Sequence, residues 1–334
     1  MKLSIVGTGK IVGEVLQMLH RDFQREVTVT GIYARQQSVE HAIDLCMAYA
    51  PTGFVYTDYA QMLSEAEADF VYIANANHVH YPYALQAIQT GHSVIVEKPL
   101  TVTREETEAL YDAAMLHGVL CLPAFSLLYM PLFEALTKAV GQLGTVHLVE
   151  CNYSQYSSRY DRYLQGDVAP AFDPACAGGS LMDINIYNLC FTIALFGPPR
   201  TVRYSPNLGF NGIDTSGVLT LQYPDFVASL IGAKDCDGPS HGIIQGERGY
   251  IEVHGPVSLM KSFTLHLRGQ APQTFTSDDG RHRLSYEFEA FRHHADERAS
   301  SPLNIPYLSR VALEVAIAVE KTRVRYRDLL PTTD

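Results

Sequence analysis

A glycine-rich turn follows the first apolar segment of the chain, and no other feature of the sequence constrains the fold as strongly. Residues 1–6 are mostly apolar, Gly7-Thr8-Gly9 follows, and a helical pattern begins near Lys10 and Ile11. Gly7 suits a tight turn, and Gly9 lets backbone N–H groups reach a pyrophosphate at the positive end of the helix. The turn therefore predicts a dinucleotide-binding domain, although the third glycine stands one position late, at Gly13. An ordinary strand–turn–helix connection is the alternative.

Strand-like and helix-like segments alternate from residue 1 to about residue 123, which favours the first interpretation. Short β-branched runs cover residues 27–32, 54–56, 70–74, 93–96 and 119–122, with amphipathic stretches of helical length between them. Such arrays form a doubly wound parallel sheet with helices on both faces, and ligands bind where the order of the strands reverses. We therefore predict an α/β fold with an N-terminal Rossmann domain.

Composition excludes several classes of protein. The 334 residues, 47% of them hydrophobic, suit two domains with sizeable cores. The net charge of −11 argues against a nucleic-acid partner, because such binding depends on phosphate neutralisation by lysine and arginine. The predicted strand at Met1 leaves no room for a signal or transit peptide, and we expect no membrane-spanning run. Six scattered cysteines indicate reduced thiols in a cytoplasmic protein.

Two later motifs add chemistry to this frame. A buried-looking strand at residues 94–96 leads directly into Glu97-Lys98-Pro99. A second segment, residues 178–187, has the sequence Gly-Gly-Ser-Leu-Met-Asp-Ile-Asn-Ile-Tyr, and its Asp183 and Tyr187 share one helical face. With the glycine turn, these motifs occur in an order that resembles the Gfo/Idh/MocA oxidoreductase family, named after glucose-fructose oxidoreductase and inositol dehydrogenase. The resemblance covers essentially the whole chain.

The resemblance implies three catalytic residues. In that family the lysine matching Lys98 lies beside the nicotinamide and the substrate hydroxyl, where partial removal from water would lower its pKa. The resemblance also implies a cis Lys98–Pro99 peptide. Tyr187 stands where a subset that includes dihydrodiol dehydrogenase has tyrosine, so we predict a Lys98–Tyr187 proton-transfer pair with Asp183 orienting the hydroxyl or the lysine. The alternatives are a helix-terminal charge for Asp183 and a core aromatic ring for Tyr187. Asn185 departs from the glycine usual in the family; its side chain enters the pocket or the local backbone accommodates it.

The end of the second predicted strand bears on the cofactor. NAD-preferring domains place a carboxylate there, whereas this chain has Tyr33-Ala34-Arg35, and Arg35 could pair with a 2′-phosphate. We therefore predict NADP ahead of NAD. The resemblance adds an Asn77-x-x-His80 pair at the nicotinamide pocket, with the preceding residues of that strand end. The predicted cofactor-binding residues are Gly7, Thr8, Gly9, Lys10, Ile11, Arg35, Ala74, Asn75, Asn77, His80, Glu97 and Lys98, and we predict no metal site.

The pattern changes after about residue 123, and we predict domains at residues 1–123 and 124–334. A connecting helix at residues 130–140 precedes long alternating runs that indicate a C-terminal α+β domain with a large, mostly antiparallel sheet. The predicted strands are 146–156, 201–205, 217–223, 227–233, 242–245, 249–253 and 263–268, and the predicted helices are 179–196, 284–299 and 308–321. The family pairs subunits through such a sheet, so the resemblance implies a homodimer or homotetramer.

A tyrosine-rich segment at residues 152–163 suggests where a substrate would bind. Tyrosines stack on rings, and arginines and hydroxyls bind polar groups, so Tyr156 and Arg159 join Lys98, Asp183 and Tyr187 as predicted substrate contacts. A plain polar loop is the alternative for this segment. We predict an NAD(P)-dependent oxidoreductase that moves hydride between nicotinamide and a secondary alcohol or carbonyl of a sugar, polyol or dihydrodiol-like molecule. The alternatives are a dinucleotide-binding sensor without catalysis and an NAD-dependent glycosidase of the same family.

Overall fold

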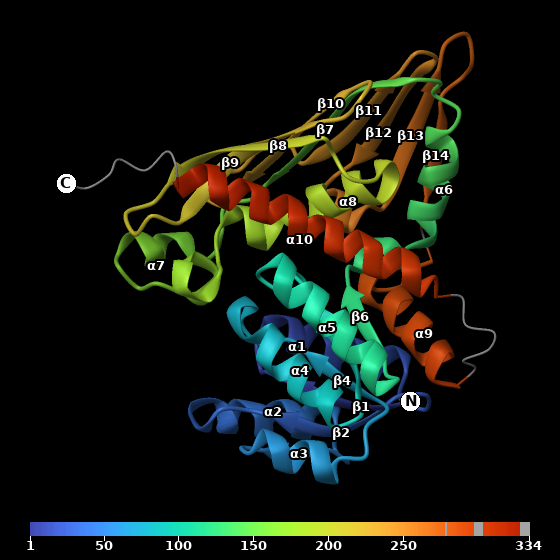
Figure 1. The fold of residues 1–334 in the computed structure, drawn as a ribbon. Coiled ribbons are helices and arrows are strands. Elements are labelled where there is room, and N and C mark those ends of the chain that lie inside the picture. The colour runs from blue at the N-terminus through green and yellow to red at the C-terminus, as the bar shows by residue number, and fades with distance from the viewer. Residues whose placement is uncertain (278, 297–302, 328–334) are drawn as a thin grey trace. The chain divides into compact units, whose positions relative to one another are not determined.

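The computed structural model describes residues 1–277, 279–296 and 303–327, which form two compact units (Figure 1). The first unit contains Met1–Ser126 and Arg281–Arg310, and the second contains Leu127–Gly280 and the residues from Val311 onward. The chain thus leaves the first unit near the predicted domain boundary and later returns to it for one segment, which the sequence-based division assigned to the second domain.

A six-stranded parallel sheet forms the centre of the first unit. Its spatial order is β3-β2-β1-β4-β5-β6, and every neighbouring pair is parallel. Strands buried on both faces need apolar side chains in succession, as the fully buried β4 illustrates. The order reverses between β1 and β4, which is the switch point of a Rossmann fold and confirms the predicted fold class. The strands are β1 (Lys2–Val6), β2 (Thr28–Tyr33), β3 (Phe54–Tyr56), β4 (Phe70–Ile73), β5 (Ser93–Glu97) and β6 (Cys121–Ala124).

Amphipathic helices accompany this sheet. Those between the strands are α1 (Lys10–Asp22), α2 (Val39–Tyr49), α3 (Tyr59–Glu65), α4 (His80–Gln89) and α5 (Arg104–His117). The returning segment supplies α9 (Arg283–Asp296), which packs against α1, where the Ser285 hydroxyl donates a 2.8 Å hydrogen bond to the Asp22 carboxylate. The predicted helix at 284–299 corresponds to α9, and its last three residues lie outside the described residues.

The second unit is built on an eight-stranded sheet with the order β14-β13-β12-β11-β7-β10-β9-β8. Only β7 and β10 pair in parallel, so the predicted, mostly antiparallel sheet is confirmed. The last strand, β14, was not predicted because its short sequence Gln-Thr-Phe-Thr is largely exposed and polar. The strands are β7 (Val146–Ser154), β8 (Thr201–Leu208), β9 (Asp214–Gln222), β10 (Val227–Ala233), β11 (His241–Gly246), β12 (Gly249–His254), β13 (Ser262–Leu267) and β14 (Gln273–Thr276).

Helices cover one face of this sheet, with α8 (Ile186–Phe196) packed on β7 and β10 (Figure 1). A π-helix over Leu181–Asn185 leads directly into α8. The other helices of the unit are α6 (Pro131–Val140), the one-turn α7 (Tyr160–Leu164) and, from Val311 onward, α10 (Ile305–Arg327). Short 3₁₀ turns elsewhere in the chain cover Gln36–Ser38, Asn77–Val79, Ser126–Tyr129, Pro170–Phe172, Pro174–Cys176 and Val257–Leu259.

One helical stretch corrects the expectation that no apolar run is long enough to span a bilayer. Among the described residues, Pro174–Phe196 has that length; its most apolar window has a mean hydropathy of 1.3, and 67% of that window is buried within the protein. The stretch includes α8 and the π-helix, which pack on the sheet. Length and composition alone do not distinguish a core helix from a membrane span, and this segment has the burial of a core helix.

Candidate active site

The glycine turn after β1 has the features of a pyrophosphate cradle. Gly7 has φ +117°, and a Cβ there would lie 2.8 Å from the Ala74 carbonyl oxygen, so only glycine fits this crossing at the switch point. A Cβ at Gly9 would meet no atom within 4 Å. The first backbone bond of α1 starts at the Val12 N–H, which leaves the N–H groups of Lys10 and Ile11 at the positive end of the helix.

Polar groups at the ends of β2 and β4 also suit a dinucleotide. Arg35 is exposed and follows β2, and no carboxylate stands between Tyr33 and Gln36. The hydroxyl groups of Tyr33 and Tyr83 lie 3.2 Å apart, and burial together with this contact raises the pKa of Tyr83 to about 12. After β4, the buried Asn75 Oδ1 has no hydrogen-bond partner in the described part of the chain, as expected for an atom that awaits a ligand donor.

His80, which was predicted to bind the cofactor, lies in the interior of the first unit. It is 1% exposed, with Nδ1 2.8 Å from the Pro99 carbonyl oxygen and Nε2 3.2 Å from the Asn75 carbonyl oxygen. A neutral imidazole has one N–H, so we assign the proton to Nδ1, which makes the shorter contact. His80 therefore holds the Pro99 turn near the end of β4, while Asn77 begins the 3₁₀ turn ahead of it.

The end of β5 carries the Glu-Lys-Pro motif, and the Lys98–Pro99 peptide is cis, as predicted. Lys98 is half-buried, whereas the Glu97 side chain is buried. The Tyr72 hydroxyl donates a 2.5 Å hydrogen bond to one Glu97 oxygen, and the Lys98 N–H donates to the other at 3.1 Å. Burial, followed by the nearby charges of Glu97 and Glu287, raises the pKa of Tyr72 well above its usual value. Glu97 therefore fixes the backbone that carries Lys98.

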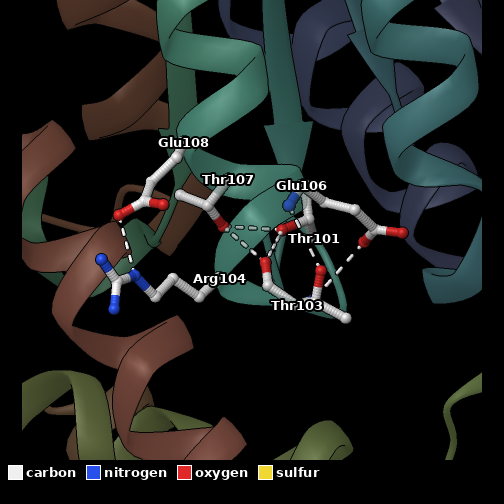
Figure 2. Close-up of polar contacts among 6 residues, drawn as sticks. All are labelled: Thr101, Thr103, Arg104, Glu106, Thr107 and Glu108. Carbon is white, nitrogen blue, oxygen red and sulfur yellow. Dashed lines mark hydrogen bonds and ion pairs between the residues drawn. The ribbon is translucent and has the colours of Figure 1, made fainter.

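A capping box anchors the loop that follows this motif (Figure 2). The Thr103 hydroxyl accepts from the Glu106 N–H at 3.2 Å, and the Glu106 carboxylate accepts from the Thr103 N–H at 3.3 Å. The buried Thr101 hydroxyl donates to the Thr103 carbonyl and lies 2.6 Å from the Thr107 hydroxyl. The four residues after Pro99 are thereby tied to the first turn of α5, which limits the movement of the Lys98 segment.

In the second unit, Asp183 lies in the π-helix and Tyr187 in the first turn of α8. Both side chains are half-buried, and the Tyr187 ring lies 6.4 Å from the ring of Tyr153 on β7. π-turns inside helices are frequent at functional sites. Asn185 proves to be a structural residue: it is fully buried and its amide donates a 3.1 Å hydrogen bond to the Leu230 carbonyl of β10.

Lys234 is a charged residue of this region that the sequence analysis missed. It follows β10 directly, is 2% exposed, and places Nζ 2.8 Å from Oδ2 of Asp183. The ammonium also donates to the Ala171 carbonyl at 2.7 Å and lies 4.1 Å from the centre of the Phe172 ring. A lysine immediately after an apolar strand was the available signal, and the same signal had identified Lys98.

Asp214 fixes the start of the helix that bears Asp183. Its half-buried carboxylate accepts from the Leu181 N–H at 2.7 Å and from the Tyr204 hydroxyl at 2.6 Å. Burial raises its pKa, while these two hydrogen bonds and the charge of Lys234 oppose that rise. A side chain at Gly179, which has φ +102°, would collide with this carboxylate, which explains the glycine there.

The predicted substrate contacts Tyr156 and Arg159 are exposed. The Tyr156 hydroxyl donates to the Asp161 carboxylate at 2.6 Å, which raises the pKa of the Tyr156 phenol. Arg159 stands at the start of α7. This segment, for which a plain polar loop was the alternative, contains a short helix whose Tyr163 packs in the interior on Phe172.

Within residues 1–277, 279–296 and 303–327, no group of three or more histidine, cysteine, aspartate or glutamate side chains is arranged to bind a metal ion.

The fold agrees with the comparisons to known proteins. Residues 1–125 match the oxidoreductase family with an NAD-binding Rossmann fold, and residues 138–252 match the GFO/IDH/MocA C-terminal domain. The chain belongs to the GFO/IDH/MocA oxidoreductase family, which confirms the resemblance read from the sequence. It is an NAD(P)-dependent oxidoreductase of the dehydrogenase/reductase type.

Three relatives illustrate the range of this similarity. The scyllo-inositol 2-dehydrogenase (NADP(+)) IolU of Bacillus subtilis (strain 168) is 31% identical over 295 residues, 87% of each protein. The trans-1,2-dihydrobenzene-1,2-diol dehydrogenase of Xenopus tropicalis is 23% identical over 252 residues, 71% of this chain and 72% of that protein. KijD10, a 3-ketoreductase from Actinomadura kijaniata solved with NADP and TDP-benzene, has the same fold, with a TM-score of 0.83 over 97% of each chain at 18% identity.

Proposed function

We propose that the protein is an NADP(H)-dependent dehydrogenase or reductase acting on a secondary alcohol or its carbonyl in a sugar or polyol. The observation that carries the proposal is the combination, in one parallel sheet, of the Gly7–Gly9 turn at the switch point and Lys98 at the end of β5. The inositol dehydrogenase relative supports a polyol, and the dihydrodiol dehydrogenase supports a neighbouring class of vicinal diols.

The proposed mechanism assigns the protein binding, orientation and proton movement. The bound nicotinamide supplies or accepts the hydride. Lys98 and Tyr187 act as the pair that moves the proton of the substrate hydroxyl, and Asp183 orients that hydroxyl. Tyr156 and Arg159 are proposed substrate contacts. Glu97 and His80 act on the backbone around Lys98 through the hydrogen bonds described above.

The first test is whether Lys98 acts in chemistry or only in binding. We would follow NADP⁺ reduction by absorbance over a panel of inositols, aldoses and dihydrodiols, and measure NADPH affinity by fluorescence. Lys98→Ala is expected to lower turnover roughly 100-fold or more while NADPH affinity stays within about threefold. Normal turnover in this variant would remove Lys98 from the mechanism.

A second test addresses the cofactor. Arg35 is proposed to pair with the 2′-phosphate of NADP, because a guanidinium binds phosphate through paired N–H groups. Arg35→Ala is expected to weaken NADPH binding about tenfold or more and to leave NADH binding unchanged. Lys10→Ala is the control: it removes a cation at the start of α1, near the pyrophosphate that both cofactors share, and should affect NADPH and NADH binding alike. Equal loss for both cofactors in Arg35→Ala would overturn the assignment.

We also propose that the protein is a cytoplasmic homodimer or homotetramer. Support comes from the face of the eight-stranded sheet opposite α8, where Leu148, Val218 and Tyr250 are 51%, 38% and 41% exposed. Strand register puts these three side chains on one face. Leu148 and Tyr250 both lie opposite Gln245. Val218 lies opposite Ile231, which pairs with Asn152, and Asn152 is on the same face of β7 as Leu148 because the two are four residues apart.

A further inference from the structure

We propose that Lys234 is a positioning residue for catalysis, which acts by holding the Asp183 carboxylate ionised and in one orientation. The inference rests on the proposed function, because it assigns Asp183 to the substrate hydroxyl. It assigns a role to a lysine that contacts Asp183 within the second unit.

The environment of Lys234 gives its ammonium group a single defined position. The Nζ atom donates to Oδ2 of Asp183 and to the Ala171 carbonyl, and it lies over the face of the Phe172 ring. An ammonium carries three N–H groups, and these neighbours offer it a carboxylate, a carbonyl and an aromatic face. With 3% of its side chain exposed, Lys234 has no room to exchange these contacts for water.

The backbone around Lys234 is fixed as firmly as its side chain. The Lys234 N–H donates to the Thr215 carbonyl at 2.8 Å, and the next residue, Asp235, accepts from the hydroxyls of Thr215 and Ser216 at 2.7 Å and 2.9 Å. The Ala171 carbonyl that accepts from Lys234 also accepts from the Gly179 N–H at 3.1 Å. Lys234 therefore joins the end of β10, the Ala171 loop and the glycine entry to the π-helix.

The consequence for Asp183 follows from charge and burial. A buried ammonium is costly unless it is paired, and the Asp183 carboxylate, 34% exposed, is the partner with which it makes a charged contact. Asp214, on neighbouring β9, is also influenced by the charge of Lys234, but its Oδ2 accepts from the Leu181 N–H and the Tyr204 hydroxyl. Lys234 thus favours the charged form of Asp183 and fixes its side chain, while a third of that side chain remains accessible to a small molecule.

The functional test is a double-mutant cycle of Lys234→Met and Asp183→Asn. Methionine has nearly the length of lysine without its charge. K234M is expected to lower kcat/KM roughly tenfold to a hundredfold, to move the acid limb of the pH profile to higher pH, and to leave NADPH affinity unchanged. In the D183N background, K234M should cause no further loss. Multiplicative effects of the two substitutions, or an unmoved acid limb, would overturn the proposal. Lys138→Met, at an exposed position of α6, is the matched control and should have wild-type activity.

A second measurement does not depend on turnover or on the folding of K234M. The ¹⁵Nζ resonance of Lys234 is followed against pH by NMR in wild type and in D183N. Loss of the carboxylate should move the Lys234 titration to lower pH, because the buried ammonium loses its charged partner. Identical titrations would refute the pairing. If the titration moves but no substrate is ever turned over, the proposed function fails while the Lys234–Asp183 pair stands.

Discussion

His80 and Glu287 are titratable side chains in the interior of the first unit, and at the residue scale they respond to pH in opposite directions. His80 is 1% exposed beside the Pro99 and Asn75 carbonyls. Glu287, on α9, is fully buried, and within the described residues neither of its carboxylate oxygens has a hydrogen-bond partner. Both groups are held neutral by burial, so folding shifts the pKa of the acid up and that of the base down.

The first prediction concerns acid stability. Burial lowers the pKa of His80 from 6.5 to about 4. Between pH 6.5 and about pH 4, His80 therefore binds a proton in the unfolded chain but not in the folded chain. The stability that neutral His80 contributes to the folded state is complete above about pH 6.5 and is lost as pH falls toward about 4. The loss amounts to roughly 3 kcal/mol. His80→Gln, which does not titrate, should show a flatter pH dependence in urea unfolding over this window; a wild-type slope in the variant would contradict the assignment.

The second prediction concerns Glu287. Burial, and then the charge of Glu97, raises the pKa of Glu287 well above 4.5. The unfolded state loses this proton first, so the group costs stability as pH rises above about 4.5. Glu287→Gln should therefore raise the free energy of unfolding at about pH 7.5 and change it little at about pH 4.5. Glu289→Gln, on the partly exposed part of the same helix, is the control and should have little effect at either pH.

The sequence identified residues whose role is visible locally and missed those whose role depends on tertiary neighbours. Lys98 stands in a short motif with a proline, so its place at a strand end was predictable. Lys234 also follows an apolar strand, but its role and that of Glu287 depend on burial beside Asp183 and near Glu97, groups that lie far away in the sequence. Glu97 was predicted as a cofactor contact. Its burial against Tyr72 could not be predicted, because Tyr72 lies on a different strand.

At the scale of elements, the start of α5 controls the segment after Lys98. The Thr103 hydroxyl and the Glu106 carboxylate satisfy two backbone N–H groups at this helix terminus. Thr103→Ala should lower the free energy of unfolding by about 1 kcal/mol. Thr137→Ala, within α6, removes a hydroxyl that only donates back to the Phe133 carbonyl and should change stability by less than about 0.5 kcal/mol. Equal effects in denaturant titrations would show that the capping box does not stabilise the loop.

Periodicity predicted long elements better than local irregularities. The helix at residues 179–196 was predicted from its apolar residues, but the π-turn within it depends on contacts with β9 and β10, including the Asp214 carboxylate on the Leu181 N–H. The one-turn α7 was not predicted, because a single turn carries too few residues to show a helical period. These irregular segments lie next to Asp183 and the proposed substrate contacts, where regular structure is interrupted most often.

At the scale of the whole molecule, alternation of strands and helices was sufficient to predict the parallel sheet and its switch point. The order β3-β2-β1-β4-β5-β6 follows from right-handed crossovers in two halves of the unit. The return of α9 to the first unit was not predictable, because its amphipathic pattern shows that one face is buried without showing against which partner.

The open face of the eight-stranded sheet supports the last prediction. Leu148 and Tyr250 are exposed there beside polar side chains such as Glu150, and the Tyr250 ring stacks on His266 with 4.3 Å between the ring centres, so this face presents exposed apolar side chains within a polar surface. Such a surface is stabilised when a second copy covers it. Leu148→Glu puts a charge at its centre and should reduce the assembly to monomers at micromolar concentration, as measured by size-exclusion chromatography with light scattering, without changing the circular dichroism spectrum. Leu164→Glu, on α7 and 59% exposed, is the matched control and should keep the wild-type mass. A monomeric wild type, or an unchanged mass for Leu148→Glu, would assign this face another role.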